Sequence, residues 1–557
     1  MNIKLKKGPK EPVVDLQLDP PVTIETLLKQ YEKELPYTIL AAKVDNEVEE
    51  LTTVLSEDCC VEFLDMRTQA ANLIYQYSLC LIYLKAIWDV LGRDVPVEIQ
   101  NSLNKGLYTE VKTPRAITEQ QVRAVERRMK ELVQLDLPIQ KEKVPWAEAV
   151  DFLRENGYDE KYRLLKNHPE IEAATFYSLE GYENFFYGDM VPSTGYIRYF
   201  ELRKYRRGVI LRFPYPSDPN RIPEYVDEKK LCAAFGEAKK WHRLTHVSYL
   251  ADLNEKVRDG AYKELVLLSE ALHEKKVAAI ADQIVKERKR IILIAGPSSS
   301  GKTTFARRLC IQLKVNGVDP LYLGTDDYFV ERKDTPLDAD GQPNYEDLEA
   351  LDIALFNRNM NDLLSGRTVD LPTFDFINGT KAFGRRITSI KPYQPILIEG
   401  IHALNGKLTR YIRDEEKFKI YISPFTQLNV DSHNRVPTTD ARMLRRMVRD
   451  YLYRGHTAQM TIAAWPKVRK GEDKNIFPFN GEADVLFNSA LAYELAILKK
   501  HVQPLLQAIE RSEPEYSDAQ RLLSFLNFFE VIEDESIIPN NSILREFIGG
   551  SIFSEYL

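Results

Sequence analysis

The residues best suited to chemistry form a glycine-rich run that follows four apolar residues, 291–294. The segment Gly296-Pro-Ser-Ser-Ser-Gly301-Lys302-Thr303 fills every position of the pattern G-x-x-x-x-G-K-[ST]. Gly296 and Gly301 allow backbone angles that a Cβ would forbid, so loop N–H groups can converge on phosphate oxygens. Lys302 would place a charge on the β- and γ-phosphates, and the Thr303 hydroxyl would hold Mg²⁺. The pattern predicts a nucleoside triphosphate site made by Gly296, Pro297, Ser298, Ser299, Ser300, Gly301, Lys302, Thr303 and Thr304.

The elements on either side of this run support the prediction. The apolar residues before it are typical of a short buried strand. After it, Phe305, Leu309 and Leu313 recur at helical spacing. A Gly/Ser-rich turn without a ligand is the alternative, but strand, glycine loop and helix in this order are the context that phosphate binding requires.

The chain from about 289 to 505 alternates apolar strands with helical patterns. We expect strands at 291–295, 320–327, 394–400, 417–422 and 483–488, and helices at 302–315, 347–364, 437–454 and 489–509. This alternation predicts an α/β fold, a parallel sheet with helices on both faces. Phosphate binding is then expected at the C-terminal ends of the strands.

About 210 residues with their motifs in order resemble the uridine kinase and phosphoribulokinase family of P-loop kinases. The first of these motifs after the glycine loop is Thr325-Asp326-Asp327-Tyr328-Phe329. A hydroxyl acceptor loses its proton as it attacks phosphorus, and a neighbouring carboxylate can take it. The resemblance implies that Asp326 is this base, with Asp327 as the alternative, and it puts Tyr328 in the substrate site. The alternative is that Asp326 and Asp327 are two acids in a solvent-facing loop and have no catalytic role.

Tyr345 and Glu346 resemble the residues with which the family holds its nucleoside. They stand where the family has a Phe that stacks on the base and an Asp that holds sugar hydroxyls. A glutamate can accept the same hydrogen bonds but reaches further. Equally, Tyr345 and Leu348 can simply pack the start of a helix.

A second acceptor motif is matched only in part. Phe374, Asp375 and Phe376 match the family's Tyr-Asp-Phe, so Phe374 and Asp375 are substrate-binding candidates. The histidine that reads the pyrimidine in uridine kinases falls on Gly379, and the following arginine falls on Lys381. Because discrimination between bases depends on buried polar partners, a nucleoside stays expected but uridine itself is in doubt.

The last two motifs concern the metal and the moving charge. Glu399 ends an apolar strand and stands where the family has an acid of the Mg²⁺ shell, so Thr303 and Glu399 are the expected metal residues. An arginine-rich helix resembles the family's lid, which brings guanidinium groups onto the phosphoryl group. Its candidates are Arg445 and Arg446 for substrate binding and Arg449 and Arg454 for catalysis, whereas most charged helices are merely solvated.

The chain before the kinase-like part resembles the front of threonyl-tRNA synthetases. Residues 1–64 resemble an α+β module of the TGS β-grasp type, with a helix after Thr23 and strands around an Asp-Asn turn. Residues 65–232 resemble the α+β editing domain, but Tyr77 and Leu81 replace its two metal histidines, so we expect a retained fold without hydrolysis. Residues 233–288 read as a helical linker, in which His242 and His246 are a weak metal candidate. The predicted domains are thus 1–64, 65–232, 233–288, 289–505 and a C-terminal extension, 506–557.

Composition fits an ordinary soluble protein of the cytoplasm. The 557 residues are 44% hydrophobic and 29% charged with a net charge of −7, which gives no overall basic surface for nucleic acid. Five scattered cysteines without a C-x-x-C pair suit a reducing compartment. We find no signal peptide and no membrane span, and we expect no membrane partner.

The resemblance implies an ATP- and Mg²⁺-dependent kinase for a nucleoside 5′-hydroxyl, acting by direct in-line transfer. One alternative is a kinase for another small hydroxyl compound, such as a sugar phosphate. The other is an RNA-associated regulator, with the front domains on tRNA and the glycine loop as a switch, which the complete acceptor and lid motifs disfavour. The apolar C-terminal extension is most simply a clamp on the core or a contact in a homo-oligomer.

Overall fold

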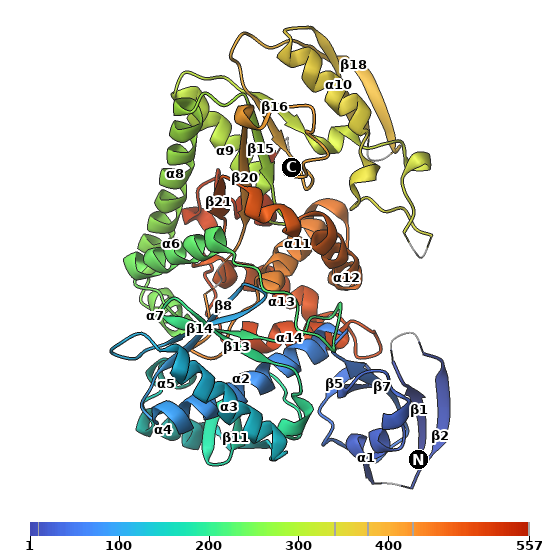
Figure 1. Ribbon diagram of the computed structural model, residues 1–557, viewed down its shortest axis with the longest axis vertical. Coiled ribbons are helices and arrows are strands. Elements are labelled where there is room, and N and C mark those ends of the chain that lie inside the picture. The colour runs from blue at the N-terminus through green and yellow to red at the C-terminus, as the bar shows by residue number, and fades with distance from the viewer. Residues whose placement is uncertain (9–10, 20, 339–340, 376–377, 426–427, 555–557) are drawn as a thin grey trace.

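The computed structural model describes residues 1–557 except 9–10, 20, 339–340, 376–377, 426–427 and 555–557. Figure 1 shows a small N-terminal sheet in blue, a larger α+β part beside it, and most of the C-terminal half stacked above both. None of the helices in the described part of the chain combines the length and hydropathy that a bilayer span requires.

The described part of residues 1–65 forms a five-stranded sheet, a separate two-stranded sheet, β3-β6, and one short α-helix. The strand order is β2-β1-β7-β4-β5, in which β1 and β7 run parallel and the other pairs antiparallel. The predicted helix after Thr23 is confirmed, since the Thr23 hydroxyl accepts from the Thr26 N–H and caps it. The elements are β1 (Asn2–Lys6), β2 (Val13–Gln17), β3 (Val22–Thr23), α1 (Ile24–Lys29), β4 (Ile39–Val44), β5 (Glu47–Glu49), β6 (Val54–Leu55) and β7 (Cys59–Asp65). Its relation to TGS modules stays a prediction.

The next part builds two antiparallel sheets around a long buried helix, α2 (Gln69–Leu91). One sheet has the order β13-β14-β9-β8 and the other β10-β11-β12. Leu81 is fully buried and Tyr77 packs edge-on against Tyr187, so both positions serve packing. The other elements are β8 (Val97–Leu103), β9 (Gly106–Val111), α3 (Glu119–Gln134), β10 (Gln140–Pro145), α4 (Trp146–Glu155), α5 (Asp159–Leu165), β11 (Ala173–Leu179), β12 (Tyr182–Phe185), β13 (Glu201–Tyr205) and β14 (Gly208–Arg212).

Three helices join this part to the glycine loop: α6 (Lys229–Thr245), α7 (Leu250–Arg258) and α8 (Tyr262–Lys286). His246 follows the end of α6 with a left-handed backbone, φ 54°, so it does not share a helix face with His242. The described residues contain no group of three or more His, Cys, Asp or Glu side chains that could hold a metal. The two histidines therefore form no metal site.

A five-stranded parallel sheet carries the glycine loop, and its order is β16-β19-β15-β20-β21. Ile291 and Leu293 of β15 pack into one apolar cluster, while Ile292 and Ile294 pack into another. Both faces of the sheet are therefore covered, which confirms the predicted α/β arrangement. The strands are β15 (Ile291–Ala295), β16 (Leu321–Gly324), β19 (Ile396–Glu399), β20 (Lys417–Ser423) and β21 (Val485–Asn488).

Helices and one hairpin surround this sheet (Figure 1). They are α9 (Lys302–Val315), α10 (Ile353–Leu364), β17 (Val369–Asp375), β18 (Thr380–Thr388), α11 (Thr438–Arg454), α12 (Ala458–Asn475), α13 (Glu494–Gln507), α14 (Tyr516–Leu526) and α15 (Arg545–Ile548). The sequence did not predict α12, which holds Pro466 within it. The residues 325–327, predicted to continue β16, instead lie in a 3₁₀ turn, Thr325–Tyr328.

One apolar cluster crosses the predicted domain boundaries. Phe176 and Phe185 of the second part pack in the same cluster as Met443 and Met447 of α11 and Phe528 near the C-terminus. The second part and the arginine-rich helix are therefore packed as one body.

Candidate active site

The glycine loop has the backbone that phosphate binding needs. Gly296 lies against the Ile422 carbonyl so closely that a Cβ there would collide with it. Gly301 has φ +86° and forms the N-cap of α9, whose first N–H groups have no partner within the helix. The loop and the first turn of α9 therefore present N–H groups that lack helical partners, and the positive end of a helix dipole, at the C-terminal edge of β15.

Lys302, Thr303 and Glu399 meet beside this loop. The Thr303 hydroxyl donates to Glu399 Oε1 at 3.1 Å, and the Tyr322 hydroxyl approaches the same oxygen at 3.4 Å. Burial raises the pKa of Glu399 to about 7, and Asp326 adds to the rise while Lys302 opposes it. A hydroxyl and a carboxylate in contact are the hard oxygen ligands that Mg²⁺ prefers, so the predicted metal pair fits the ion.

Asp326 follows β16, directly beside β19 and Glu399. Solvent reaches its side chain, but the surrounding protein reduces its hydration and raises the pKa of its carboxyl. Lys302 and Arg454 lower that pKa, so both cations lie within electrostatic reach of Asp326. Asp327 is instead held by Arg386, whose guanidinium donates to it at 2.6 Å. The geometry therefore favours Asp326 over Asp327 as the base.

The predicted acceptor residues separate into two groups. Glu346 faces the loop: burial raises the pKa of its carboxyl, and Arg446 and Lys302 act against that rise. Tyr345 is 38% exposed, and its ring stands edge-on to Phe329, which in turn contacts Phe374. This aromatic row is exposed at the Tyr345 end, where a flat ring could stack.

Tyr328 does not belong to this surface. It is 1% exposed, and its hydroxyl accepts from Asn359 at 3.2 Å within the core. Its expected part in substrate binding is therefore wrong, because no face of the ring is open. Within the short 3₁₀ turn, the side chain of Asp326 is exposed and that of Tyr328 is buried.

The polar side chains of the hairpin motif bind neighbouring residues of this chain. Asp375 accepts from the Asn378 N–H at 3.0 Å and from its side-chain amide at 2.6 Å, which closes the turn after β17. Lys381 donates to Asp352 at 2.5 Å. Phe376 falls outside the described residues. Asp375 thus shapes the turn, and Lys381, at the position of the family's arginine, is held in an ion pair.

The arginines of α11 have two different environments. Arg442 and Arg445 are buried, and they form ion pairs with Glu472 and with Glu494. Arg442 also donates to the Ser298 carbonyl at 3.1 Å, so this half of the helix supports the glycine loop from beneath. Arg445 was expected to bind substrate, but at 0% exposure it cannot reach one and acts in positioning.

The second half of α11 faces the site. The Asp450 carboxylate, at 0% exposure, binds Arg446 at 3.1 Å, Arg449 at 2.7 Å and Arg454 at 3.4 Å. Burial would raise the pKa of Asp450, but these three cations lower it overall. Arg446 also donates to the Ser298 hydroxyl at 3.1 Å. Asp450 therefore fixes the guanidinium groups that are able to meet phosphate oxygens.

Sequence reasoning missed Glu472. Its carboxylate accepts from the Ser298 N–H at 3.2 Å and from Arg469 at 2.9 Å, besides its pair with Arg442. The residue lies in α12, whose Thr457 cap and helical spacing were the available signals. Nothing local in the sequence connects it to a loop 174 residues away.

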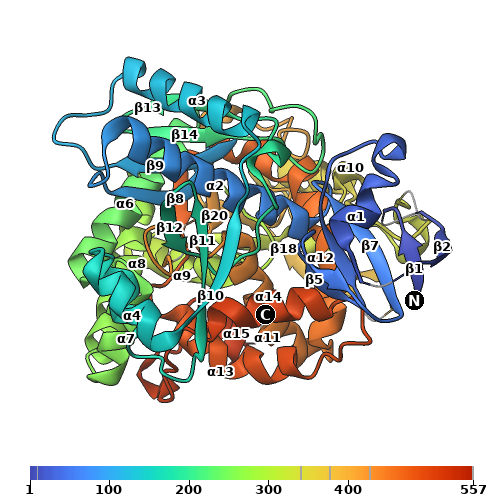
Figure 2. The same ribbon diagram turned by 90° about the horizontal axis from the view of Figure 1, so that it is seen from below.

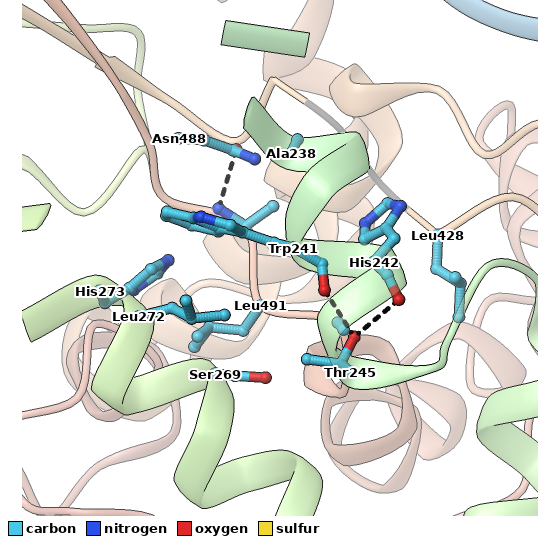
Figure 3. Close-up of a pocket in the computed structure, with 12 residues that line it drawn as sticks. Ala238, Trp241, His242, Thr245, Ser269, Leu272, His273, Leu428, Asn488 and Leu491 are labelled. Carbon is cyan, nitrogen blue, oxygen red and sulfur yellow. Dashed lines mark hydrogen bonds between the residues drawn. The ribbon is translucent and has the colours of Figure 1, made fainter. Parts of the chain in front are cut away.

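Two cavities lie apart from this site. One of about 20 Å³, enough for a single water, is lined by His242 and His273 between α6 and α8 (Figure 3). Another of about 480 Å³ is lined by Glu50, Lys141 and Tyr177 in the front half of the chain. Neither is lined by a residue of the glycine loop.

Comparisons with known proteins agree with the presence of this site. Residues 291–496 match the Phosphoribulokinase / Uridine kinase family. Uridine kinases of Staphylococcus aureus strains JH9 and Newman are 32% identical over 209 residues, 37% of this chain and 91% of theirs. The chain belongs to this family.

Two solved structures are also similar to part of the chain. A possible uridine kinase from Bacillus stearothermophilus is 21% identical with a TM-score of 0.27, covering 38% of this chain and 97% of its own. A putative fructose transport system kinase from Silicibacter sp. TM1040 has the same identity and TM-score and is covered over 98% of its length.

Proposed function

We propose that this chain is an ATP-dependent kinase that phosphorylates the 5′-hydroxyl of a nucleoside. The observation that supports this best is the meeting of Lys302, Thr303, Asp326 and Glu399 at the ends of three adjacent parallel strands. Asp326 would accept the proton of the attacking hydroxyl. Lys302 and the guanidinium groups around Asp450 would stabilise charge on the transferring phosphoryl group.

Thr303 and Glu399 are the residues that would hold Mg²⁺, which supplies charge neutralisation on the phosphates when bound. Glu346 would accept hydrogen bonds from sugar hydroxyls, and Tyr345 would stack on the base. Arg446, on the Ser298 hydroxyl, would contact the phosphates.

A second candidate is a kinase for another small hydroxyl compound, such as a sugar phosphate. It is favoured by Gly379, which has no side chain, and by Lys381, whose ammonium is engaged by Asp352 at 2.5 Å. Gly379 stands where uridine kinases have the histidine that reads the base, and Lys381 stands where they have the following arginine. An RNA-associated role for the front half has no comparable support in the site.

The test is ADP release from the full-length protein with Mg²⁺-ATP and a panel of nucleosides and sugar phosphates. We expect release with a nucleoside and phosphate on its 5′ oxygen, identified by mass spectrometry. Release only with a sugar phosphate would favour the second candidate, and no release with any alcohol would refute both.

A further inference from the structure

The C-terminal segment 535–553 touches the glycine loop, although it lies beyond the residues that match the family. Glu546 Oε2 accepts from the Thr304 N–H at 3.1 Å and from the Thr304 hydroxyl at 2.7 Å. Ile543 packs so closely on Gly301 that a Cβ there would strike its side chain. The family comparison gives no role to either contact.

Glu546 occupies a helix N-terminus. Thr304 is the third residue of α9, so its N–H has no partner within the helix. The N-cap, Gly301, has no side-chain oxygen, and Glu546 supplies the missing acceptor from 242 residues away. The same loop and helix N–H groups are those that cradle phosphates in this motif.

The strand order shows which end of a donor would meet Glu546. Asp326 and Glu399 follow β16 and β19, which lie on one side of β15, while β20 and β21 lie on the other. Arg445 donates to the Ser489 carbonyl after β21 and stands 5.1 Å from the Phe547 ring. A donor whose γ-phosphate faces Asp326 must therefore extend its inner phosphate and nucleoside towards Glu546.

The contact is built into the fold. Ser542 donates to Glu270 at 2.5 Å, and Arg545 donates to the Glu535 carbonyl at 2.6 Å. Ile543 and Phe547 are 0% exposed, and α15 packs on α11, as Figure 2 shows. An ordered carboxylate at this position opposes a phosphate at the same N–H group, because both are anions.

We propose that Glu546 is an autoinhibitory carboxylate that holds the Thr304 N–H, and that its side chain turns away when the donor nucleotide binds while α15 stays packed. The identity of the ligand, a nucleoside triphosphate, rests on the proposed function. The C-terminal segment then regulates occupancy of the donor site.

Titration calorimetry on the full-length protein tests the competition. The probes are Mg²⁺-ATP and inorganic tripolyphosphate, and the variant is Glu546→Gln, which keeps an acceptor for Thr304 but removes the charge. We expect both probes to bind roughly threefold to tenfold more tightly than to the wild type. Glu533→Gln removes the same charge at a 75% exposed side chain and should change neither affinity. Equal or weaker binding by the Glu546→Gln protein would overturn the inference.

A protein whose Glu546→Gln variant binds ATP more tightly, yet which phosphorylates no alcohol, would refute the proposed function and leave the inference standing.

Discussion

Among single residues, Asp326 and Asp327 show how neighbouring acids acquire different roles. Asp327 is neutralised by Arg386 at 2.6 Å, whereas Asp326 lies near Lys302 and Glu399 without such a pair. Its raised pKa brings it nearer to the value that suits a general base at neutral pH. The structure thus gives a physical reason for the choice that the motif position suggested.

Replacement of Asp326 tests this assignment. In Asp326→Asn we expect kcat to fall by about 10²- to 10⁴-fold, because the amide cannot accept the proton, while ATP still binds. Steady-state kinetics and ATP titration measure the two effects. Asp327→Asn is the matched control, in which catalysis should fall less. An Asp326→Asn protein with wild-type kcat would contradict the assignment.

The buried side chain of His273 should make the free energy of unfolding smaller in acid. His273 lies in the cavity of Figure 3, with its ring 5.2 Å from that of Phe487. Burial, with smaller contributions from Arg308 and Arg445, lowers its pKa from 6.5 to about 3. Between these values the unfolded chain binds a proton that the folded chain does not, so stability should fall as pH falls below 6.5.

The expected slope is about 1.4 kcal/mol per pH unit for each such histidine. Urea unfolding between pH 7 and about pH 5 measures it. His273→Asn should flatten the acid side of the profile. His456→Asn, at a 44% exposed side chain, should not. Unchanged slopes in both variants would show that His273 titrates normally.

At the scale of elements, most of α11 is held rigidly and supports the glycine loop, and only its last turn is exposed beside the site. Its first half is pinned by Glu472 and Glu494 beneath the Ser298 and Ser299 carbonyls. Its last turn carries Arg454, whose side chain is 53% exposed. Closure over a substrate would therefore involve this last turn rather than the whole helix.

The pair of Arg442 and Glu472 tests the supporting half. Arg442→Met leaves Glu472 as a buried charge with one cation fewer, and we expect a loss of about 3–5 kcal/mol in unfolding free energy. The double variant Arg442→Met/Glu472→Met should recover most of this loss. Denaturant unfolding gives both values. A single variant as stable as wild type would show that the pair contributes little.

At the scale of the whole molecule, the front half holds the segment that leads into α11. Lys161 Nζ lies 3.1 Å from His433 Nδ1 and 3.7 Å from Asp431, and all three side chains are buried. Ile99 donates to the Ser432 carbonyl at 2.8 Å, and the Tyr187 hydroxyl donates to the Arg435 carbonyl at 2.8 Å. The front half is thus a scaffold for the arginine helix.

Lys161→Met should therefore affect both folding and the distant site. The variant leaves Asp431 buried without its cation, so we expect about 3–5 kcal/mol of destabilisation and a higher KM for ATP. Lys161→Met/Asp431→Asn should restore stability in part, and Lys166→Met, at an exposed lysine, is the control. Unaltered KM in a destabilised protein would limit the scaffold to folding.

The sequence by itself determined the glycine loop and the parallel sheet, and it predicted that Thr303 and Glu399 come together. These depend on contiguous residues: a buried strand, two glycines and a helix within 291–315 allow one local geometry, and apolar strands that alternate with helices can only be buried between layers. Asp326 and Glu399 follow because strand ends of a parallel sheet share one edge. The boundaries between the front domains and their relation to synthetase modules stay predictions.

Only the tertiary structure decided the partners of charged side chains. The sequence predicted substrate contacts for Arg445 and Tyr328, which the fold buries, and it gave no role to Glu472 or Glu546. Their burial depends on packing between segments 170 or more residues apart in the case of Glu472 and Glu546. A local pattern records which residues favour an interior, but not which opposite charge the fold will bring to meet them.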